Sequence, residues 1–164
     1  MKVTTLTVDC GGTGIKASVL DKAGQVLIDF PYLKTPYPLT PRNLIQIIKD
    51  FVIADNRINR VTIGLPGMIR DGKIIIIPHY INKNGPRTAP DPQLKRTWYG
   101  FNIQEVLTKQ LKIPVLVLND AEVHGAAVIA GKGLECVLTF GTGLGSAMFS
   151  EGKLAPHLEI SHAT

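Results

Sequence analysis

Two glycine-rich segments, far apart in the chain, share one layout. Residues 6–20 read LTVDCGGTGIKASVL and residues 138–149 read LTFGTGLGSAMF. Each has an apolar run, a Gly-Thr-Gly turn and a second apolar run, which together predict a β-hairpin with a glycine-rich tip. Glycines at such a tip let successive backbone N–H groups turn inward and bind phosphate oxygens without interference from side chains. Two such loops indicate two lobes that close on a phosphate chain.

Length and composition fit one globular domain, or one domain with part of another. The chain has 164 residues, of which 45% are hydrophobic and 19% charged, so it can bury one core. Its most apolar stretches are too short to span a bilayer, and its N-terminus lacks the features of a signal peptide. Cys10 and Cys136 lack metal-ligand spacing. We therefore expect a reduced, cytoplasmic protein with no membrane partner.

The net charge of +5 is modestly basic. The sequence has no stripe of interleaved basic and aromatic residues, so we expect a solvated surface and no nucleic-acid partner. A third interpretation, in which the basic charge attracts an anionic phosphoryl donor, fits the two glycine-rich loops better than DNA does.

The order of the predicted elements indicates a mixed sheet with helices on its faces. Three strand-like runs come first and predict an antiparallel meander, and helices then alternate with buried strands. The expected strands are 3–8, 15–20, 25–30, 60–65 and 114–118, and the expected helices are 43–55 with Thr40 as cap, 102–111 and 121–130. This order is that of a ribonuclease H-like α/β lobe with a five-stranded mixed sheet, followed by the first hairpin of a second lobe.

Residues 82–96 form a long connection with three prolines and no apolar periodicity. A connection of this length in a compact domain is usually functional or disordered. We interpret it as an exposed flap, with a plain linker as the alternative.

The second hairpin begins near residue 137, and the sequence ends at Thr164. One hairpin and a short further segment cannot bury their own apolar face. We therefore expect 1–120 to form the first lobe and 121–164 to begin an incomplete C-terminal lobe of a truncated chain. A homodimer, which we also expect, is the alternative source of the missing layer.

Four motifs follow one another along the chain. They are Asp9-x-Gly11-Gly12-Thr13-x-Ile15-Lys16, Gly64-Leu65-Pro66-Gly67, Asn119-Asp120-Ala121 and Phe140-Gly141-Thr142-Gly143-Leu144-Gly145. In this order they resemble the first phosphate motif, the turn beside the sugar, the element with the catalytic aspartate and the second phosphate motif of the ROK family. That family of repressors, open reading frames and kinases belongs to the superfamily of sugar kinases, actin-like ATPases and Hsp70. The resemblance covers essentially the whole chain and is closest to polyphosphate glucokinases.

The resemblance implies a sugar kinase of the glucokinase type, which transfers a phosphoryl group from ATP or polyphosphate to a hexose, here expected to be glucose. It implies Mg²⁺ as cofactor. The phosphate-binding residues that it implies are Asp9, Gly11, Gly12, Thr13, Lys16, Gly141, Thr142 and Gly143, and the sugar-binding residues are Gly67, Asn119, Asp120, Glu159 and His162. The alternative is a non-catalytic, sugar-responsive regulator. Such regulators carry a helix-turn-helix ahead of the first phosphate motif, whereas the first strand here begins at residue 3, so we expect a kinase, although this chain alone can be inactive.

The chemistry of phosphoryl transfer gives Asp120 a role of its own. A sugar hydroxyl is a poor nucleophile near neutral pH, so the transfer benefits from a carboxylate that accepts its proton. Asp120 follows the strand 114–118 at its carboxyl end, where open sheets place ligands, and we predict that it is the general base. Asn119 offers a donor and an acceptor to sugar hydroxyls. The alternative for both residues is a helix cap before Ala121, and the two roles are compatible.

Asp9 ends the first strand beside the glycines. Mg²⁺ keeps several waters and needs one or two carboxylates plus substrate phosphates, so Asp9 can hold the hydrated ion near the donor. The alternative is an aspartate that only forms the turn. Lys16 is otherwise a solvated residue of the second strand, and its contact with phosphate is implied by the resemblance alone.

Near the C-terminus, Glu159 and His162 resemble a segment whose glutamate and histidine contact sugar hydroxyls. Ser161 stands where the family has glycine, and its β-carbon would clash if the backbone there needs a positive φ. Many family members join this histidine to a cysteine-rich zinc segment, which this sequence lacks, so we predict no zinc. The other histidines lack partners at ligand spacing and are expected to be structural or exposed; they are His79, His124 and His157.

Polyphosphate is a long polyanion, so an enzyme that uses it should line the approach to its phosphate loops with cationic side chains. The candidates in the flap and near the second hairpin are Lys83, Arg87, Lys95, Arg96 and Lys153. The alternative is that these residues belong to a solvated loop.

Overall fold

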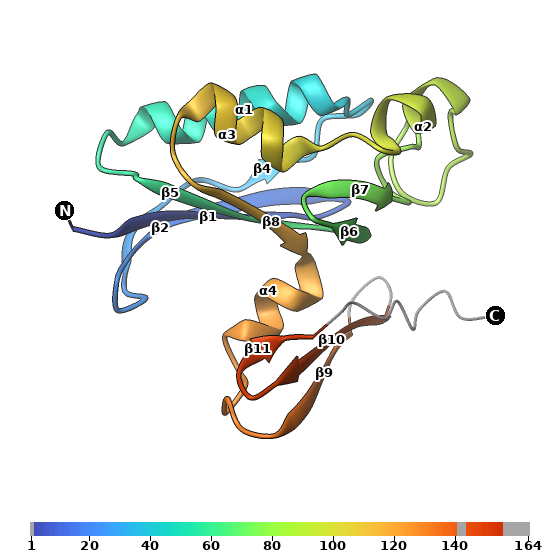
Figure 1. Cartoon of the computed structure of the whole chain (residues 1–164). Coiled ribbons are helices and arrows are strands. Elements are labelled where there is room, and N and C mark those ends of the chain that lie inside the picture. Colours follow the sequence, from blue (N-terminus) through green and yellow to red (C-terminus); the bar gives the residue numbers. More distant parts are fainter. Residues whose placement is uncertain (1, 141–143, 156–164) are drawn as a thin grey trace.

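The computed structural model describes residues 2–140 and 144–155. A large mixed sheet carries helices on one face, and helix α4 leads from the end of this sheet to a smaller second sheet on the other side (Figure 1). No helix in the described part of the chain is long and apolar enough to cross a membrane.

The large sheet is mixed, as predicted, and has the strand order β3-β2-β1-β5-β8. Its first three strands form the antiparallel meander, and β1, β5 and β8 run parallel to one another. The strands are β1 (Thr4–Cys10), β2 (Gly14–Asp21), β3 (Val26–Asp29), β5 (Arg60–Leu65) and β8 (Val115–Asn119). A short strand that the sequence did not predict, β4 (Leu33–Lys34), adds to β2.

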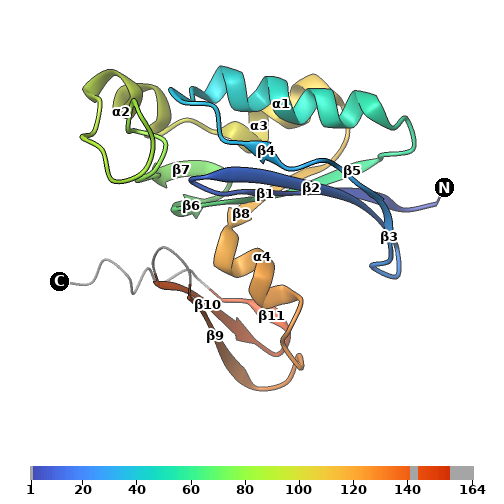
Figure 2. The ribbon, with the colours of Figure 1, turned by 180° about the vertical axis from the view of Figure 1, so that it is seen from behind.

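The two helices on the large sheet are amphipathic and lie on the same face (Figure 2). Helix α1 (Pro41–Ala54) is capped by Thr40, whose hydroxyl accepts a hydrogen bond from the amide of Asn43 at 3.2 Å, as predicted. Helix α3 (Ile103–Leu111) is capped by Asn102. Alternate residues of β1 point toward these helices, so Leu6, Val8 and Cys10 are buried, while Thr7 and Asp9 point to the opposite face.

Helix α4 (Asp120–Ala126) is shorter than the predicted helix 121–130. After Ala127 the chain leaves the helix, and the amides of Ala130, Gly131 and Lys132 donate to the carboxylate of Glu135 at 2.6, 2.8 and 3.2 Å. The prediction of a longer helix was wrong because a side chain from the next strand satisfies these amides in place of helical carbonyls.

The flap is only partly a loop. Its C-terminal portion forms helix α2 (Pro92–Trp98), which is capped by Asp91 and buries Leu94 and Trp98. The indole N–H of Trp98 donates to the carbonyl of Leu39 at 2.9 Å. The expectation of an exposed flap over 82–96 was therefore wrong for the part that forms α2. Pro92 does not prevent this helix, because it occupies the first turn, where proline is tolerated.

A hairpin of β6 (Met68–Arg70) and β7 (Lys73–Ile76) was missed by the sequence analysis. Its turn has Asp71 and Gly72 at φ 51° and 71°. An Asp-Gly pair between apolar runs is a strong hairpin signal, so the sequence did contain the information.

The second sheet consists of β9 (Leu134–Phe140), β10 (Leu144–Ser150) and β11 (Lys153–Leu154) in an antiparallel arrangement. The predicted second hairpin is thus confirmed in its strands, while its tip at 141–143 lies outside the described residues. One face packs on α4, where a β-carbon on Gly125 would lie 2.7 Å from the ring of Phe149. The other face exposes Leu134, Leu138 and Phe140, which is 82% exposed.

The packing of α2 predicts the effect of removing its anchor. Because Trp98 is fully buried against Tyr80, with ring centroids 5.4 Å apart, Trp98→Ala should lower the free energy of unfolding by about 3–5 kcal/mol. Urea unfolding followed by circular dichroism measures this change. Trp98→Phe, which keeps a ring but loses the bond to Leu39, should cost less, and a Trp98→Ala loss below about 1 kcal/mol would show that α2 is not packed on the core.

Candidate functional site

The carboxyl ends of the three parallel strands meet at one edge of the large sheet. In register, Asp9 of β1 lies beside Gly64 of β5, and Gly64 lies beside Leu118 of β8. A β-carbon on Gly64 would lie 3.3 Å from the Cα of Asp120, so glycine lets the start of α4 approach β5 closely. Asp9 and Asp120 therefore flank a residue that has no side chain.

The carboxyl group of Asp120 is partly buried. This burial raises its pKa above that of an ordinary aspartate, and the negative charge of Asp9 adds to the effect. The amide of Ala121, which donates to Oδ1 at 2.9 Å, and the neighbouring His124 oppose the shift. A carboxylate with a raised pKa accepts a proton more readily than an exposed one.

Asn119 joins α4 to the turn at Gly67. Its side-chain carbonyl accepts a hydrogen bond from the amide of Ala121 at 2.8 Å, and its Nδ2 donates to the carbonyl of Gly67 at 2.7 Å. The carboxylate of Glu122 completes a capping box by accepting from the amide of Asn119 at 2.9 Å. Asn119 is thus the helix cap that the sequence analysis gave as its alternative role, and it brings Gly67 next to Asp120.

Gly67 adopts a φ of 149°, where a side chain would overlap the carbonyl oxygen of Ile76. Only glycine fits this turn. The structure therefore joins Gly67 to Asn119, the residue before Asp120, and the contact of these three residues with a sugar, which the resemblance implies, is a prediction.

Residues 11–13, here called the glycine loop, connect β1 to β2 beside Asp9. The amide of Gly11 donates to the carbonyl of Gly14 at 2.8 Å, whereas the amides of Gly12 and Thr13 make no hydrogen bond to any described residue. Unpaired amides on adjacent residues are suited to bind an anion. The loop thus offers two donors next to the two carboxylates.

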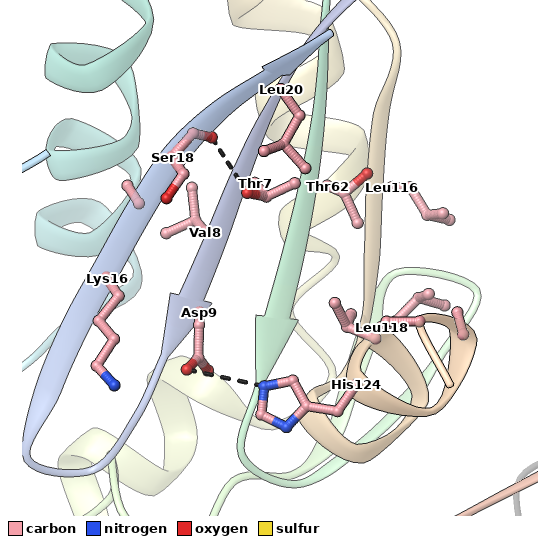
Figure 3. A pocket seen from close by; sticks show the side chains of 14 residues that line it. Thr7, Val8, Asp9, Lys16, Ser18, Leu20, Thr62, Leu116, Leu118 and His124 are labelled. Carbon is pink, nitrogen blue, oxygen red and sulfur yellow. Dashed lines mark hydrogen bonds and ion pairs between the residues drawn. The ribbon is translucent and has the colours of Figure 1, made fainter. Parts of the chain in front are cut away.

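Asp9 lies between Lys16 and His124 (Figure 3). Lys16 is its cross-strand neighbour on β2, and Nε2 of His124 is 3.9 Å from Oδ2 of Asp9. The side chain of Asp9 is 41% exposed, so a hydrated ion can reach its carboxylate. Within the described residues no three or more histidine, cysteine or acidic side chains are grouped to hold a metal.

A groove of about 550 Å³ borders Asp9 on the face of the sheet opposite α1 and α3. Figure 3 shows Thr7, Thr62, Leu116 and Leu118 along its floor. Neither Asp120 nor the glycine loop lines this groove. Of the two carboxylates, Asp9 therefore lines the groove and Asp120 does not.

Two histidines contact the site in ways that the sequence analysis missed. A β-carbon on Gly12 would lie 3.0 Å from Cγ of His79, so this imidazole covers the glycine loop. Burial lowers the pKa of His79, opposed by the charge of Asp120. The contact joins residues far apart in sequence, so no local signal reveals it. His124, by contrast, lies four residues after Asp120 on one face of α4, and this spacing was a usable signal.

The remaining predicted site residues cannot be placed. Those of the second glycine-rich tip and of the C-terminal segment lie outside the described residues; they are Gly141, Thr142, Gly143, Glu159 and His162, together with Ser161 and His157.

Comparison with known proteins is consistent with the arrangement of motifs. Polyphosphate glucokinase from Mycobacterium leprae is 34% identical over 163 residues, which cover 94% of this chain and 46% of that protein. An inorganic polyphosphate/ATP-glucomannokinase from Arthrobacter sp. strain KM superimposes with a TM-score of 0.74 at 29% identity, covering 98% of this chain and 63% of that one. A ROK family glucokinase from Streptomyces griseus, solved with glucose and AMPPNP, gives a TM-score of 0.70 at 25% identity, covering 98% and 48%.

The chain spans about half the length of the curated relatives that it matches. The sequence profile of the ROK family matches residues 5–156, so all four motifs lie within the matched region. The chain is a member of the ROK family.

Proposed function

We propose that this chain carries the catalytic base and the first donor loop of a sugar kinase that phosphorylates a hexose, with glucose as the substrate. The observation that supports this most is the place of Asp120, which directly follows β8 and packs against Gly64, the neighbour of Asp9 in the sheet; its partial burial there raises its pKa. Relatives named as polyphosphate glucokinase and as ROK glucokinase support the same reaction class. We also propose the division into a first lobe, 1–120, and the start of a second lobe, 121–164.

In the proposed reaction the carboxylate of Asp120 accepts the proton of the attacking sugar hydroxyl. The hydroxyl oxygen forms a bond to the terminal phosphorus of the donor, and the bond from that phosphorus to its bridging oxygen breaks. The amides of Gly12 and Thr13 bind phosphate oxygens, and Asp9 holds the hydrated Mg²⁺ near them. The ion supplies positive charge that offsets the charge of the phosphates. The turn at Gly67 and Asn119 positions the sugar.

Asp120→Asn tests the base. The amide keeps the shape and can still accept from Ala121, but it cannot take up a proton, so kcat should fall by about 10²–10⁴ with little change in KM for glucose. Steady-state kinetics on an active preparation of the protein measure this. A variant within about twofold of the wild-type kcat would show that Asp120 acts only as part of the helix terminus.

The same substitution should stabilise the fold. Because the pKa of Asp120 is raised in the folded state, that state holds the proton more tightly than the unfolded chain, and stability falls as pH rises from an ordinary aspartate pKa through the raised one. Asp120→Asn removes this loss, so its Tm at pH 7 should exceed that of the wild type. The exposed Asp50→Asn on α1 is the matched control and should leave Tm unchanged. An unchanged or lower Tm for Asp120→Asn would contradict the raised pKa.

We propose polyphosphate as a donor besides ATP. Lys95 and Arg96 lie in α2, at the end of the large sheet where β1 ends (Figure 1). The ammonium of Lys95 lies 5.2 Å from the ring centroid of Tyr99 and remains exposed. Both residues thus carry positive charge on a helix, and not in the loop that the sequence analysis expected, at the end of the sheet where the glycine loop begins.

Neutralising this pair tests the donor. The double variant Lys95→Gln/Arg96→Gln should raise KM for polyphosphate several-fold and leave KM for ATP nearly unchanged. The wild-type KM for polyphosphate should also rise with salt, because the Debye length is only about 10 Å at 0.1 M. Lys2→Gln/Lys22→Gln, with the same charge change at the opposite end of the sheet, is the control. If the two double variants change KM for polyphosphate equally, or if the protein does not use polyphosphate, the donor is a nucleotide.

A further inference from the structure

Four consecutive carbonyl groups at the end of β1 and in the glycine loop accept hydrogen bonds from side-chain hydroxyls. Tyr80 donates to Cys10 at 2.9 Å and to Gly11 at 3.3 Å, and Thr35 donates to Gly11 at 2.9 Å. The remaining two bonds run from Tyr37 to Gly12 at 2.7 Å and from Tyr32 to Thr13 at 3.1 Å. We call the four donors, Tyr32, Thr35, Tyr37 and Tyr80, the hydroxyl clamp.

The clamp comes from two segments that the motif analysis left without a role. Three donors lie in 32–37, a stretch that β4 fixes against β2, and the backbone amide of Thr35 also donates to the carbonyl of Thr13 at 3.2 Å. Tyr80 follows β7 and is fully buried. The donors therefore belong to ordered parts of the core and its edge.

The hydroxyls are held in their donating form. Burial raises the pKa of Tyr37 to about 12, and burial also raises the pKa of Tyr80 well above its usual value. Both phenols thus keep their protons throughout the physiological pH range. Thr35, which is buried, does not titrate.

Peptide planarity turns these bonds into a constraint on the loop's amides. In a trans peptide the carbonyl of one residue and the N–H of the next point in opposite directions. Fixing the carbonyl of Gly11 therefore aims the amide of Gly12 away from Thr35 and Tyr80. Fixing the carbonyl of Gly12 likewise aims the amide of Thr13 away from Tyr37. These are the two amides that make no hydrogen bond within the described residues.

We propose that the hydroxyl clamp preorganises the amides of Gly12 and Thr13 for the phosphate oxygens of the donor. Glycine loops are otherwise free to adopt many conformations, and ordering them on binding costs affinity. Because the clamp orders the loop in the folded protein, the donor does not have to order it on binding. Its members are positioning residues, and this role rests on the proposed function of the glycine loop as a donor site.

Tyr37 isolates the effect, since its hydroxyl is the sole donor to the carbonyl of Gly12 among the described residues. Tyr37→Phe removes one oxygen and keeps the ring. With binding of Mg²⁺-tripolyphosphate measured by isothermal titration calorimetry on this chain, Kd should rise about 3- to 10-fold. In an active preparation KM for the phosphoryl donor should rise by a similar factor, while KM for glucose should stay unchanged.

Tyr99→Phe is the matched control, because the hydroxyl of Tyr99 makes no hydrogen bond to a described residue and phenylalanine keeps the ring that Lys95 contacts. It should bind tripolyphosphate as the wild type does. If Tyr37→Phe does not fold, Thr35→Val tests the clamp at Gly11, and Thr35→Ser, which keeps a hydroxyl, should restore binding.

Unchanged tripolyphosphate binding in Tyr37→Phe or Thr35→Val would overturn the clamp. An equal loss of donor and glucose affinity would also overturn it, since that pattern reports general damage to the fold. If the variants weaken tripolyphosphate binding while the wild type phosphorylates no sugar, the clamp stands and the proposed kinase function fails. The two proposals are thus separated by one set of measurements.

Discussion

The close approach of α4 to β5 at Gly64 is the constraint on which the site depends. A larger residue at this position would push the first residue of α4 away from the sheet, because the space where a β-carbon would point is 3.3 Å from Asp120. Asn119, which precedes this residue, is the side chain that donates to the carbonyl of Gly67. The missing side chain of Gly64 thus lets Asp120 lie close to β5, beside the strand that carries Asp9.

The proximity of the two carboxylates has an energetic consequence. Burial and the charge of Asp9 raise the pKa of Asp120, so the ionised form that a base requires is the form that the fold disfavours. Such local cost is common at functional sites and is offset by the rest of the structure. Here the offset comes from the capping box and from the bond between Asn119 and Gly67, which hold α4 in place.

The sequence predicted those parts of the fold whose signals are local. Alternating apolar residues gave the strands of the large sheet, and Thr40 followed by an apolar stripe gave α1. It could not predict the hydroxyl clamp or the contact of His79 with Gly12, because these join residues 19 to 70 positions apart. The α2 helix was hidden for another reason: three prolines nearby masked the spacing of Leu94 and Trp98.

Helix α4 couples the two sheets through the residue proposed as the base. Its N-terminal end is fixed to the large sheet by Asn119, while Ala121 and Gly125 contact the second sheet at Gly145 and Phe149. The second sheet packs one face on α4 and leaves its other face exposed. The large sheet, in contrast, has α1 and α3 on the face that points away from α4 (Figure 2). A displacement of the second sheet that carried α4 would therefore also move Asp120. Asn119 opposes such a displacement, because it holds the start of α4 by two side-chain hydrogen bonds.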